Sequence, residues 1–238
     1  MNILAIGAHP DDIEISCGGT LAKYAKQGHK VFTATTTNGN IGSAVLPMEE
    51  IARIRKEEAR RAAAVIGAEY LCLDYDDEML YDDRSVRVNM INLIRYCKPD
   101  VILTHSPHDY NPDHELTSKI VNDVAVMIPI AKIVTPNKPC DKIPLLAYFE
   151  SASGVGFIPT EYVDITDVWE VKKAMCNCHQ SQIAWMSANY KETVGDSNFL
   201  DDVEIEARYR GIQCGVKYAE GFRMAYNAHR IAPYRVLP

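Results

Sequence analysis

The sequence predicts an α/β protein with a Rossmann-like, doubly wound, mainly parallel sheet, helices on both faces, and a small mixed region at the C-terminal end. From residue 2 to about 151, short runs rich in β-formers alternate with longer amphipathic segments, which is typical of a parallel sheet covered on both sides. Right-handed crossovers then favour the strand order 3-2-1-4-5. The first and fourth strands are neighbours in that order, at the switch point where such sheets bind ligands.

The chain supplies these elements in turn. Residues 2–7 form an apolar run that ends at a polar cluster, which is typical of a first strand. Further strands are expected at 31–37, 70–73, 101–104 and 145–149. Helices are expected between them, near 18–28, 49–67, 85–97 and 112–127.

Two of these helices carry clear local signals. In the helix at 49–67 an apolar face lies opposite a charged one, and Gly67 ends it. The apolar face carries Ile51, Ile54, Ala62 and Ile66, and the charged face carries Lys56, Glu57, Arg60 and Arg61. In the helix at 112–127, Asn111 can cap the first turn and Pro112 suits the first position. We therefore expect His114 in the first turn of that helix.

After residue 151 the pattern changes to a mixed region. We expect a strand at 161–165, a helix from about 168 to 182 and another from about 200 to 213. No linker, low-complexity tract or internal repeat separates this region from the rest. The chain is predicted to be a single domain over 1–238, with a Rossmann-like part at 1–151 and a C-terminal extension at 152–238.

Composition argues against several classes of protein. The 25 Lys and Arg residues against 32 Asp and Glu give a net charge of −7, which disfavours nucleic-acid and membrane-surface partners. The longest uncharged apolar run, residues 124–131, is far shorter than the ~20 residues of a membrane-spanning helix, so stable membrane insertion is not expected. The N-terminus has no basic segment before its apolar run, which predicts a cytoplasmic protein without a secretory signal.

The seven cysteines are expected to be reduced thiols. They are odd in number and scattered, and several lie in apolar runs, so small buried hydrophobic side chains are the favoured interpretation. The segment Cys176-Asn177-Cys178-His179 has the residue types of a metal cluster. Its spacing is not the usual C-x2-C and no second half follows, so we do not assign it as a metal site.

Metal-ligating residue types gather after the first and fourth strands. The first strand leads into His9, Asp11 and Asp12, and the fourth leads into His105, His108 and His114. In the predicted order these strand ends are neighbours. His9, one aspartate and one histidine of the second cluster can then converge as a two-histidine, one-carboxylate set with an open position, which is the ligand set of a catalytic zinc. The other aspartate is free to act as a general base.

The second cluster offers a choice of ligand. His114 is the best fixed candidate because the Asn-Pro start holds its helix turn, whereas His105 is expected to be partly buried and His108 lies on a loop. Asp113, next to His114, has two interpretations. It is either an acceptor for an imidazole N–H of a ligand, or a favourable acid in the first turn of a helix.

Three motifs resemble those of a known family. They are Gly7-Ala8-His9-Pro10-Asp11-Asp12, Gly18-Gly19-Thr20 at a helix start, and Asn111-Pro112-Asp113-His114. Together they resemble the PIG-L (LmbE-like) zinc-dependent N-deacetylase family. Weaker landmarks extend the similarity over most of the chain: Thr37-x-Gly39-x-x-Gly42-Ser43, Arg55-x-Glu57-Glu58, Asp74 to Asp77, His179-x-Ser181-Gln182 and Tyr218-Ala219-Glu220.

The resemblance implies particular roles. The metal ligands, for one Zn²⁺ per chain, match His9, Asp12 and His114, and the general base matches Asp11. The positions that hold sugar hydroxyls match Arg55 and Asp77. By pattern alone, however, Arg55 is a surface charge of its helix and Asp77 is a turn residue.

One position departs from the family. The usual second motif is His-Pro-Asp-His, and Asn111 replaces its first histidine, which is thought to help stabilise the oxyanion or the leaving amine. Asparagine can donate a hydrogen bond but has no proton to give. Tyr110 or His108 could take this electrophilic role instead.

The sequence therefore predicts a hydrolase that removes the acetyl group from an N-acetylglucosamine-type sugar or conjugate, with a small N-acetylated sugar as its partner. Mixed nitrogen and oxygen ligands suit zinc, although iron(II) or cobalt could occupy the same set. A metal amidase of sugar–thiol conjugates stays open, because it would use the same metal, base and water. A homo-oligomer is an expectation from analogy with such folds alone.

A non-catalytic class also stays open. Gly39, Gly42 and the helix N-termini could hold a phosphate or nucleotide in a binding module. The first strand lacks a G-x-G-x-x-G turn, and the two carboxylates that follow it would repel an anion, so this alternative is disfavoured.

Overall fold

The computed structural model describes residues 1–150, 152–189, 199–226 and 234–238. In this part of the chain seven strands form one sheet in the order β3-β2-β1-β4-β5-β7-β6. The strands are β1 (Asn2–Gly7), β2 (Lys30–Thr37), β3 (Glu69–Tyr75), β4 (Val101–His105), β5 (Leu145–Phe149), β6 (Glu161–Asp164) and β7 (Ala219–Met224). The first five are parallel, which confirms the predicted order 3-2-1-4-5, and β7 is antiparallel to both β5 and β6.

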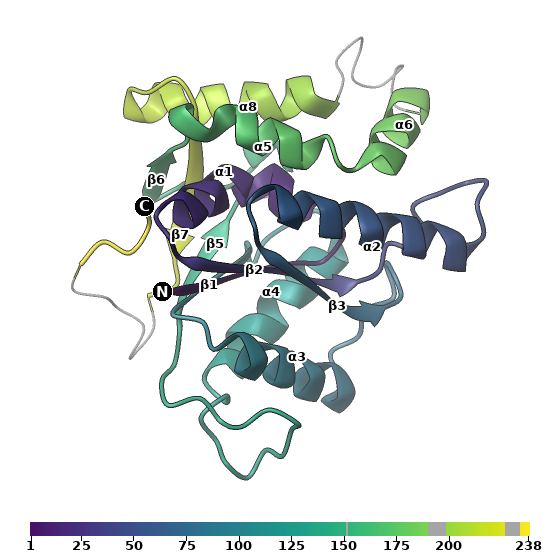
Figure 1. Cartoon of the computed structure of the whole chain (residues 1–238), viewed down its shortest axis with the longest axis vertical. Coiled ribbons are helices and arrows are strands. Elements are labelled where there is room, and N and C mark those ends of the chain that lie inside the picture. Colours follow the sequence, from purple (N-terminus) through teal and green to yellow (C-terminus); the bar gives the residue numbers. More distant parts are fainter. Residues whose placement is uncertain (151, 190–198, 227–233) are drawn as a thin grey trace.

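Helices cover both faces of the sheet, as predicted. Figure 1 shows α1, α2, α5, α6 and α8 on one side and α3 and α4 on the other. The helices are α1 (Asp12–Lys26), α2 (Met48–Val65), α3 (Arg84–Cys97), α4 (Pro112–Ala125), α5 (Trp169–Cys176), α6 (Gln180–Asn189) and α8 (Phe199–Cys214), with short 3-10 turns at Ala152–Gly154 and Thr166–Val168. The α/β class predicted from the alternation of elements is thus confirmed.

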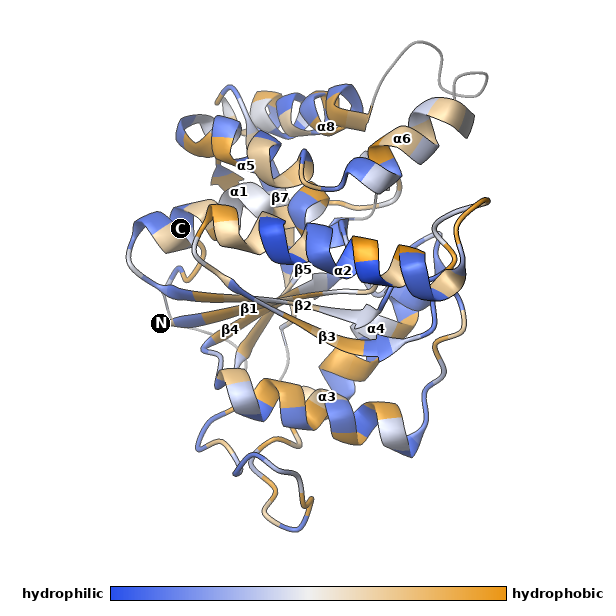
Figure 2. Ribbon diagram, turned by 45° about the vertical axis from the view of Figure 1, so that its right-hand side comes forward, coloured by the Kyte–Doolittle hydropathy of each residue, from blue (hydrophilic) through white to orange (hydrophobic). Residues whose placement is uncertain are grey.

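Two hydrophobic cores lie on the two faces. One joins α1, α5 and β7 through Leu21, Trp169 and Phe222, and the other joins α3 and α4 through Met90 and Ile120. Figure 2 shows hydrophobic residues along α3 and in the central strands, whereas the visible side of α2 is largely hydrophilic. Burial of both sheet faces explains why the strands β1 and β4 are nearly continuous apolar runs.

Helix α1 differs from its expected start. It begins at Asp12 rather than near residue 18, and its backbone is non-helical at Cys17, where φ is −143°. The predicted start coincides with the segment after this kink. The kink leaves the N–H groups of Gly19 and Thr20 to donate to the Glu220 carboxylate, at 2.9 and 2.7 Å. The motif Gly18-Gly19-Thr20 therefore marks an internal helix start.

The C-terminal region differs more from expectation. The single helix expected at 168–182 is two helices, α5 and α6, because the chain turns between Cys176 and a fully buried His179. Strand β7 was not expected, because Glu220, Gly221 and Arg223 break the apolar pattern of a strand. It nevertheless pairs on both sides.

The structure also bears on the cysteines and on membrane insertion. All seven cysteines are free, and Cys17, Cys97 and Cys176 are buried. In the described part of the chain, no helix is both long enough and apolar enough to cross a membrane.

Candidate metal centre and active-site cavity

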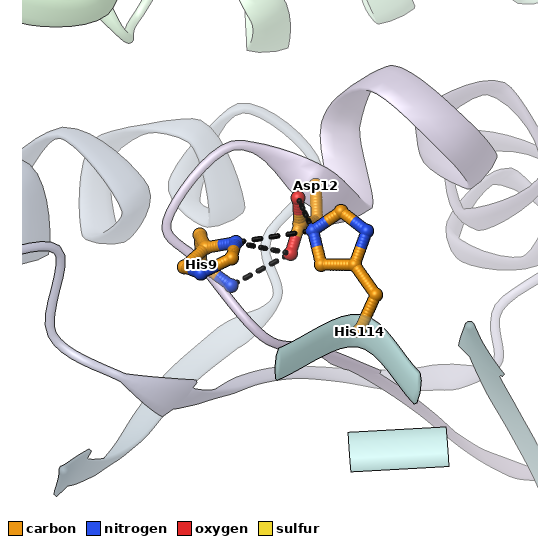
Figure 3. Close-up of side chains that lie close together, drawn as sticks. All are labelled: His9, Asp12 and His114. Atoms are coloured by element: carbon orange, nitrogen blue, oxygen red, sulfur yellow. Dashed lines mark hydrogen bonds and ion pairs between the residues drawn. The ribbon is translucent and has the colours of Figure 1, made fainter. Parts of the chain in front are cut away.

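The side chains of His9, Asp12 and His114 converge where β1 and β4 end. His9 Nδ1 lies 3.1 Å from His114 Nε2, and His114 Nε2 lies 3.3 Å from Asp12 Oδ1. Figure 3 shows the two imidazoles on either side of the Asp12 carboxylate. All three residues are buried. The structure therefore brings together the three side chains that the family resemblance implies as metal ligands.

A strained turn separates the two adjacent aspartates. Asp11 has φ 138° and ψ −28°, a conformation that costs on the order of 1–3 kcal/mol for a residue other than glycine. After this turn Asp12 begins α1, and its Oδ2 accepts a hydrogen bond from the His9 backbone N–H at 2.6 Å. The turn therefore directs Asp12 toward the histidines, while Asp11 faces Arg55 at 3.2 Å.

His114 is fixed by the start of α4. The Asn111 side-chain oxygen accepts from the backbone N–H groups of Asp113 and His114, at 2.8 and 3.3 Å. Pro112 occupies the first turn of the helix. This is the cap that the sequence predicts, and it places His114 at the fourth strand's end.

Each of the two imidazoles also faces carboxylates on its outer side. His114 Nδ1 is 2.9 Å from Asp109 Oδ1. His9 Nε2 is buried without a hydrogen-bond partner among the described residues, and its nearest carboxylate oxygens are those of Asp77 at 3.4 Å and Asp113 at 3.6 Å. Asp113, expected as an imidazole acceptor, therefore lies against His9, while its Oδ2 accepts from the Glu78 N–H at 2.8 Å.

This donor set fits a divalent metal ion. Two imidazole nitrogens and a carboxylate face one another on the inner side, and carboxylates face the outer nitrogens, as is usual for histidines that ligate metals. Two other groups, His105/Asp109/His114 and His9/Asp77/Asp113, have the ligand types as well. Both of these groups rely on the carboxylates that face the outer sides of His114 and His9, so the inner set is the better candidate.

The pKa values of the residues in the centre are strongly shifted from their usual ranges. Burial lowers the pKa of His114, but Asp12 and Asp109 outweigh it and raise the pKa to about 9. Burial opposes ionisation of Asp12, yet the surrounding His114, His105 and His9 hold the pKa of its carboxyl well below the usual range. The buried carboxylates therefore favour a positive charge in the centre. A metal cation would supply this charge on displacing the protons of the imidazoles.

The sequence favours His114 over His105 as a metal ligand. In the structure His105 lies behind the ligand set. It is 2% exposed, its ring stacks on that of His114 at 4.0 Å between centroids, and its Nε2 lies 2.9 Å from the Ala8 N and 3.0 Å from Asp12 Oδ2. Burial and the neighbouring His114 lower the pKa of His105 to about 4. His105 thus packs behind Asp12 and His114 and supports them.

Arg55 and Asp77 are not the surface groups that their local patterns indicate. Both are 4% exposed, and Arg55 Nη1 lies 3.4 Å from Asp77 Oδ2. Arg55 Nη2 also donates to the Pro10 carbonyl at 2.9 Å. The pattern misled here because Arg55 reaches inward across the end of the sheet instead of toward solvent. The positions implied by the family resemblance do line the cavity.

Gly39 and Gly42 make room for that guanidinium. A Cβ at either position would come within 2.6 or 2.7 Å of Arg55 atoms, and Gly39 has φ +74°. Since Arg55 fills the space next to these glycines, they do not form the open phosphate cradle that the binding-module alternative requires.

The three candidates for the electrophilic role are placed differently. Asn111 is engaged through both ends of its amide, because Nδ2 donates to Glu78 Oε1 at 2.6 Å while Oδ1 caps α4. Tyr110 is 75% exposed and lines the cavity with its ring 5.6 Å from that of His114. His108 is exposed on the loop after β4.

A cavity of about 780 Å³ opens above the centre. Its floor contains the metal-site residues and Asp11, and its far wall comes from Glu150, which follows β5, and from the C-terminal part of the chain. That wall includes Glu150, Trp185, Met186, Phe199, Val203 and Glu206. Sequence reasoning missed this wall, because its residues carry no local pattern and are distant from the histidine motifs.

Buried contacts lock the C-terminal part onto α1 and α2. Glu220, which pairs with Lys172 at 2.6 Å, accepts from the Gly19 and Thr20 N–H groups of α1, and His179 Nε2 is 3.1 Å from Glu14 Oε2. Ser181 donates from its hydroxyl to Glu58 at 2.6 Å. The late landmarks of the sequence are therefore the contacts that position this wall.

The fold and the site define a Rossmann-like α/β protein with a two-histidine, one-carboxylate centre at its topological switch point. A profile of the PIG-L family, described as GlcNAc-PI de-N-acetylase, matches residues 4–125. The chain belongs to this family, which confirms the resemblance seen in its motifs.

The chain is similar both to proteins named as deacetylases and to one named as a hydratase. The chain is 30% identical over 235 residues to diacetylchitobiose deacetylase of Thermococcus kodakarensis, covering 93% of this chain and 82% of that protein. It is 26% identical over 189 residues to 4-oxalmesaconate hydratase of Pseudomonas putida, covering 75% and 73%. The crystal structure of N,N'-diacetylchitobiose deacetylase from Pyrococcus horikoshii is similar with a TM-score of 0.80 and 27% identity, covering 93% of this chain and 82% of that one.

Proposed function

We propose that the protein is a zinc-dependent hydrolase that removes the acetyl group from an N-acetylglucosamine-type amino sugar or its conjugate. One observation carries the proposal: His9, Asp12 and His114 form a metal-binding set at the floor of a cavity, with the Asp11 carboxylate beside them. The names of two similar proteins, both diacetylchitobiose deacetylases, support an acetamide on a sugar as the reacting group.

His9, Asp12 and His114 would hold the zinc ion. Zinc bound there would supply Lewis acidity, which polarises an acetamide carbonyl and lowers the pKa of water to about 7. Asp77, Asp109 and Asp113 keep the two imidazoles oriented from outside.

Asp11 is the proposed general base. Its carboxylate accepts a proton from the attacking water and returns it to the departing amine, so the C–N bond breaks and acetate and a free amine are released. Arg55 holds Asp11 Oδ2 at 3.2 Å and keeps the carboxylate oriented. Burial raises the pKa of Asp11, which makes its carboxylate a stronger base.

Neutral hydrogen-bond donors would help the metal to stabilise the oxyanion that forms during the reaction. Tyr110 is the favoured donor, because its exposed side chain lines the cavity near His114. Asn111 could contribute only if its amide released Glu78. Sugar hydroxyls are proposed to bind Arg55 and Asp77, which both line the same cavity.

The test is release of amine and acetate from N-acetylglucosamine and its glycosides by zinc-loaded protein, with and without a chelator. Asp11→Ala should lose about 10²–10⁴ in rate while zinc stays bound, since general base catalysis is worth that much. Asp11→Asn, which keeps the size of the side chain, is the matched variant. If Asp11→Ala removes the zinc instead, the roles of Asp11 and Asp12 are reversed.

Similarity to 4-oxalmesaconate hydratase favours one alternative, addition of water to a carbon–carbon double bond at the same centre. Loss of ultraviolet absorbance from a conjugated dienoate, with no amine released from any acetamide, would establish that reaction in place of deacetylation. An amidase of sugar–thiol conjugates would instead release an amine from the conjugate and not from N-acetylglucosamine glycosides.

A further inference from the structure

The loop after β3 places two adjacent carboxylates in the lining of the cavity, Asp77 and Glu78. Asp77 is buried, and each of its oxygens already faces a donor. Thr37 Oγ1 donates to Asp77 Oδ1 at 2.6 Å, and Arg55 Nη1 lies 3.4 Å from Asp77 Oδ2. The side chain of Glu78 is instead 38% exposed. Of the two carboxylates, Glu78 is therefore the one that is open to a molecule in the cavity.

Contacts from the start of α4 hold Glu78 in place. Its backbone lies in the left-handed region, with φ 57°, and a residue other than glycine keeps this conformation only where its surroundings fix it. The Glu78 N–H donates to Asp113 Oδ2 at 2.8 Å, and Asn111 Nδ2 donates to Glu78 Oε1 at 2.6 Å. The carboxylate is thus fixed relative to the helix turn that carries His114.

One oxygen of this carboxylate is left for a ligand. Oε1 accepts from Asn111 and lies 4.0 Å from His9 Nε2, whereas Oε2 has no donor among the described residues. In the same part of the chain, no lysine or arginine forms an ion pair with Glu78. A carboxylate has acceptors only, and a charge-assisted hydrogen bond is among the stronger ones. Glu78 Oε2 is therefore suited to a hydrogen-bond donor of the substrate.

The short distance to His9 indicates which donor this is. An acetamide bound at the metal centre holds the sugar carbon that bears it, C2, close to His9 and hence to Glu78. The ring neighbours of C2 are C1, to which a conjugate is attached, and C3, which carries a hydroxyl group. We infer, on the basis of the proposed function, that Glu78 accepts a hydrogen bond from the C3 hydroxyl group of the reacting sugar and is a specificity-determining residue.

This contact should discriminate strongly between sugars. A bound sugar displaces water from Glu78, so an analogue without the C3 hydroxyl group leaves the carboxylate with an unpaired oxygen. A site that is built to bind a substrate hydroxyl group rejects the analogue that lacks it far more strongly than an apolar pocket rejects a missing methylene group.

Three methyl glycosides test the inference, those of N-acetylglucosamine, its 3-deoxy analogue and its 6-deoxy analogue. For acetate release by the zinc-loaded wild type, kcat/KM should be at least tenfold lower for the 3-deoxy compound than for the parent compound. Glu78→Ala should reduce this ratio to less than threefold, because the parent loses a hydrogen bond that the 3-deoxy compound never makes. The loss on the 6-deoxy compound should be the same in both proteins.

A merely structural role of Glu78 gives a different result. It lowers kcat/KM for the parent and the 3-deoxy compound alike, so equal ratios in wild type and Glu78→Ala overturn the inference and leave the proposed deacetylase activity intact. No acetate released from any of the three compounds by the zinc-loaded wild type overturns both.

Two further variants complete the test. Glu78→Gln keeps the size of the side chain and an acceptor oxygen but not the charge, so it should bind as much zinc as the wild type and give an intermediate ratio. This variant also carries the test if Glu78→Ala does not fold, and a wild-type ratio in Glu78→Gln then overturns the inference. Glu170→Gln, which changes an 82% exposed carboxylate of α5, should keep the wild-type ratio.

Discussion

At the floor of the cavity the carboxylates stand among imidazoles, whereas at the far wall they stand beside one another. His114, His105 and His9 keep the pKa of Asp12 low, so this carboxylate is ionised and ready for a cation. Burial and Glu150 raise the pKa of Glu206, so this carboxyl is favoured in its neutral form. The same kind of side chain is therefore favoured as an anion at one end of the cavity and as a neutral acid at the other.

The two ends also differ in how the chain builds them. The floor comes from short motifs after β1 and β4, and each motif fixes its own geometry through a turn or a helix cap. The wall comes from α6 and α8, and contacts such as His179–Glu14 and Ser181–Glu58 hold the start of α6 against α1 and α2. Substitutions at the floor should therefore change chemistry, and substitutions at the wall should change which substrate is accepted.

The strongest test of this division is removal of a metal ligand. His114→Ala should lose zinc and at least about 10³-fold in kcat/KM, because a Lewis acid supplies several kcal/mol of transition-state stabilisation. Metal content by atomic absorption and acetate release measure the two losses. His29→Gln changes a histidine at the opposite end of the sheet, next to β2, and should alter neither. Full zinc content in His114→Ala would contradict the ligand assignment.

A smaller effect is expected one contact further out. Asp109 Oδ1 faces His114 Nδ1 at 2.9 Å, and loss of such a partner typically costs 10–100-fold in metal affinity. Asp109→Ala should show this loss in a competition titration with a chelator. Asp109→Asn retains an acceptor and should lose less. Equal zinc affinity in the wild type and both variants would show that Asp109 does not orient His114.

The sequence predicts the floor of the cavity better than its far wall, because the floor is built from short local motifs. The parallel strand order and the convergence of His9, Asp12 and His114 follow from local motifs on neighbouring strands. The inward path of Arg55 could not be predicted, because it depends on the space next to Gly39 and Gly42. The wall could not be predicted either, since Trp185 and Glu206 reach the cavity only through the packing of α6 and α8.

A further prediction concerns Gly39, because Arg55 fills the space next to this residue. Gly39→Ala would place a Cβ 2.6 Å from Arg55 at a residue with φ +74°, which should cost about 1–3 kcal/mol of stability. It should also lower kcat, because displaced Arg55 no longer orients Asp11. Gly28→Ala has a similar φ of +80° but open space around its Cβ, so it separates backbone strain from the clash. A loss of kcat in both variants would contradict the role of Arg55.

The smallest expected effect concerns the titration of Glu206 at the far wall. The pKa of Glu206 is raised in the folded protein, whereas in the unfolded chain it is ordinary, near ~4.3. Between these values the folded state binds a proton that the unfolded state lacks, so stability is lost as the pH rises through this window. Glu206→Gln removes this dependence.

The Tm of Glu206→Gln relative to wild type should therefore increase between pH 5 and pH 8, by about 2–4 °C, the shift that ~1 kcal/mol produces in a chain of this size. Differential scanning calorimetry across that range measures it. Glu170→Gln, at an exposed position, should give a difference that does not vary with pH. Parallel Tm profiles for wild type and Glu206→Gln would mean that Glu206 is ionised in the folded protein.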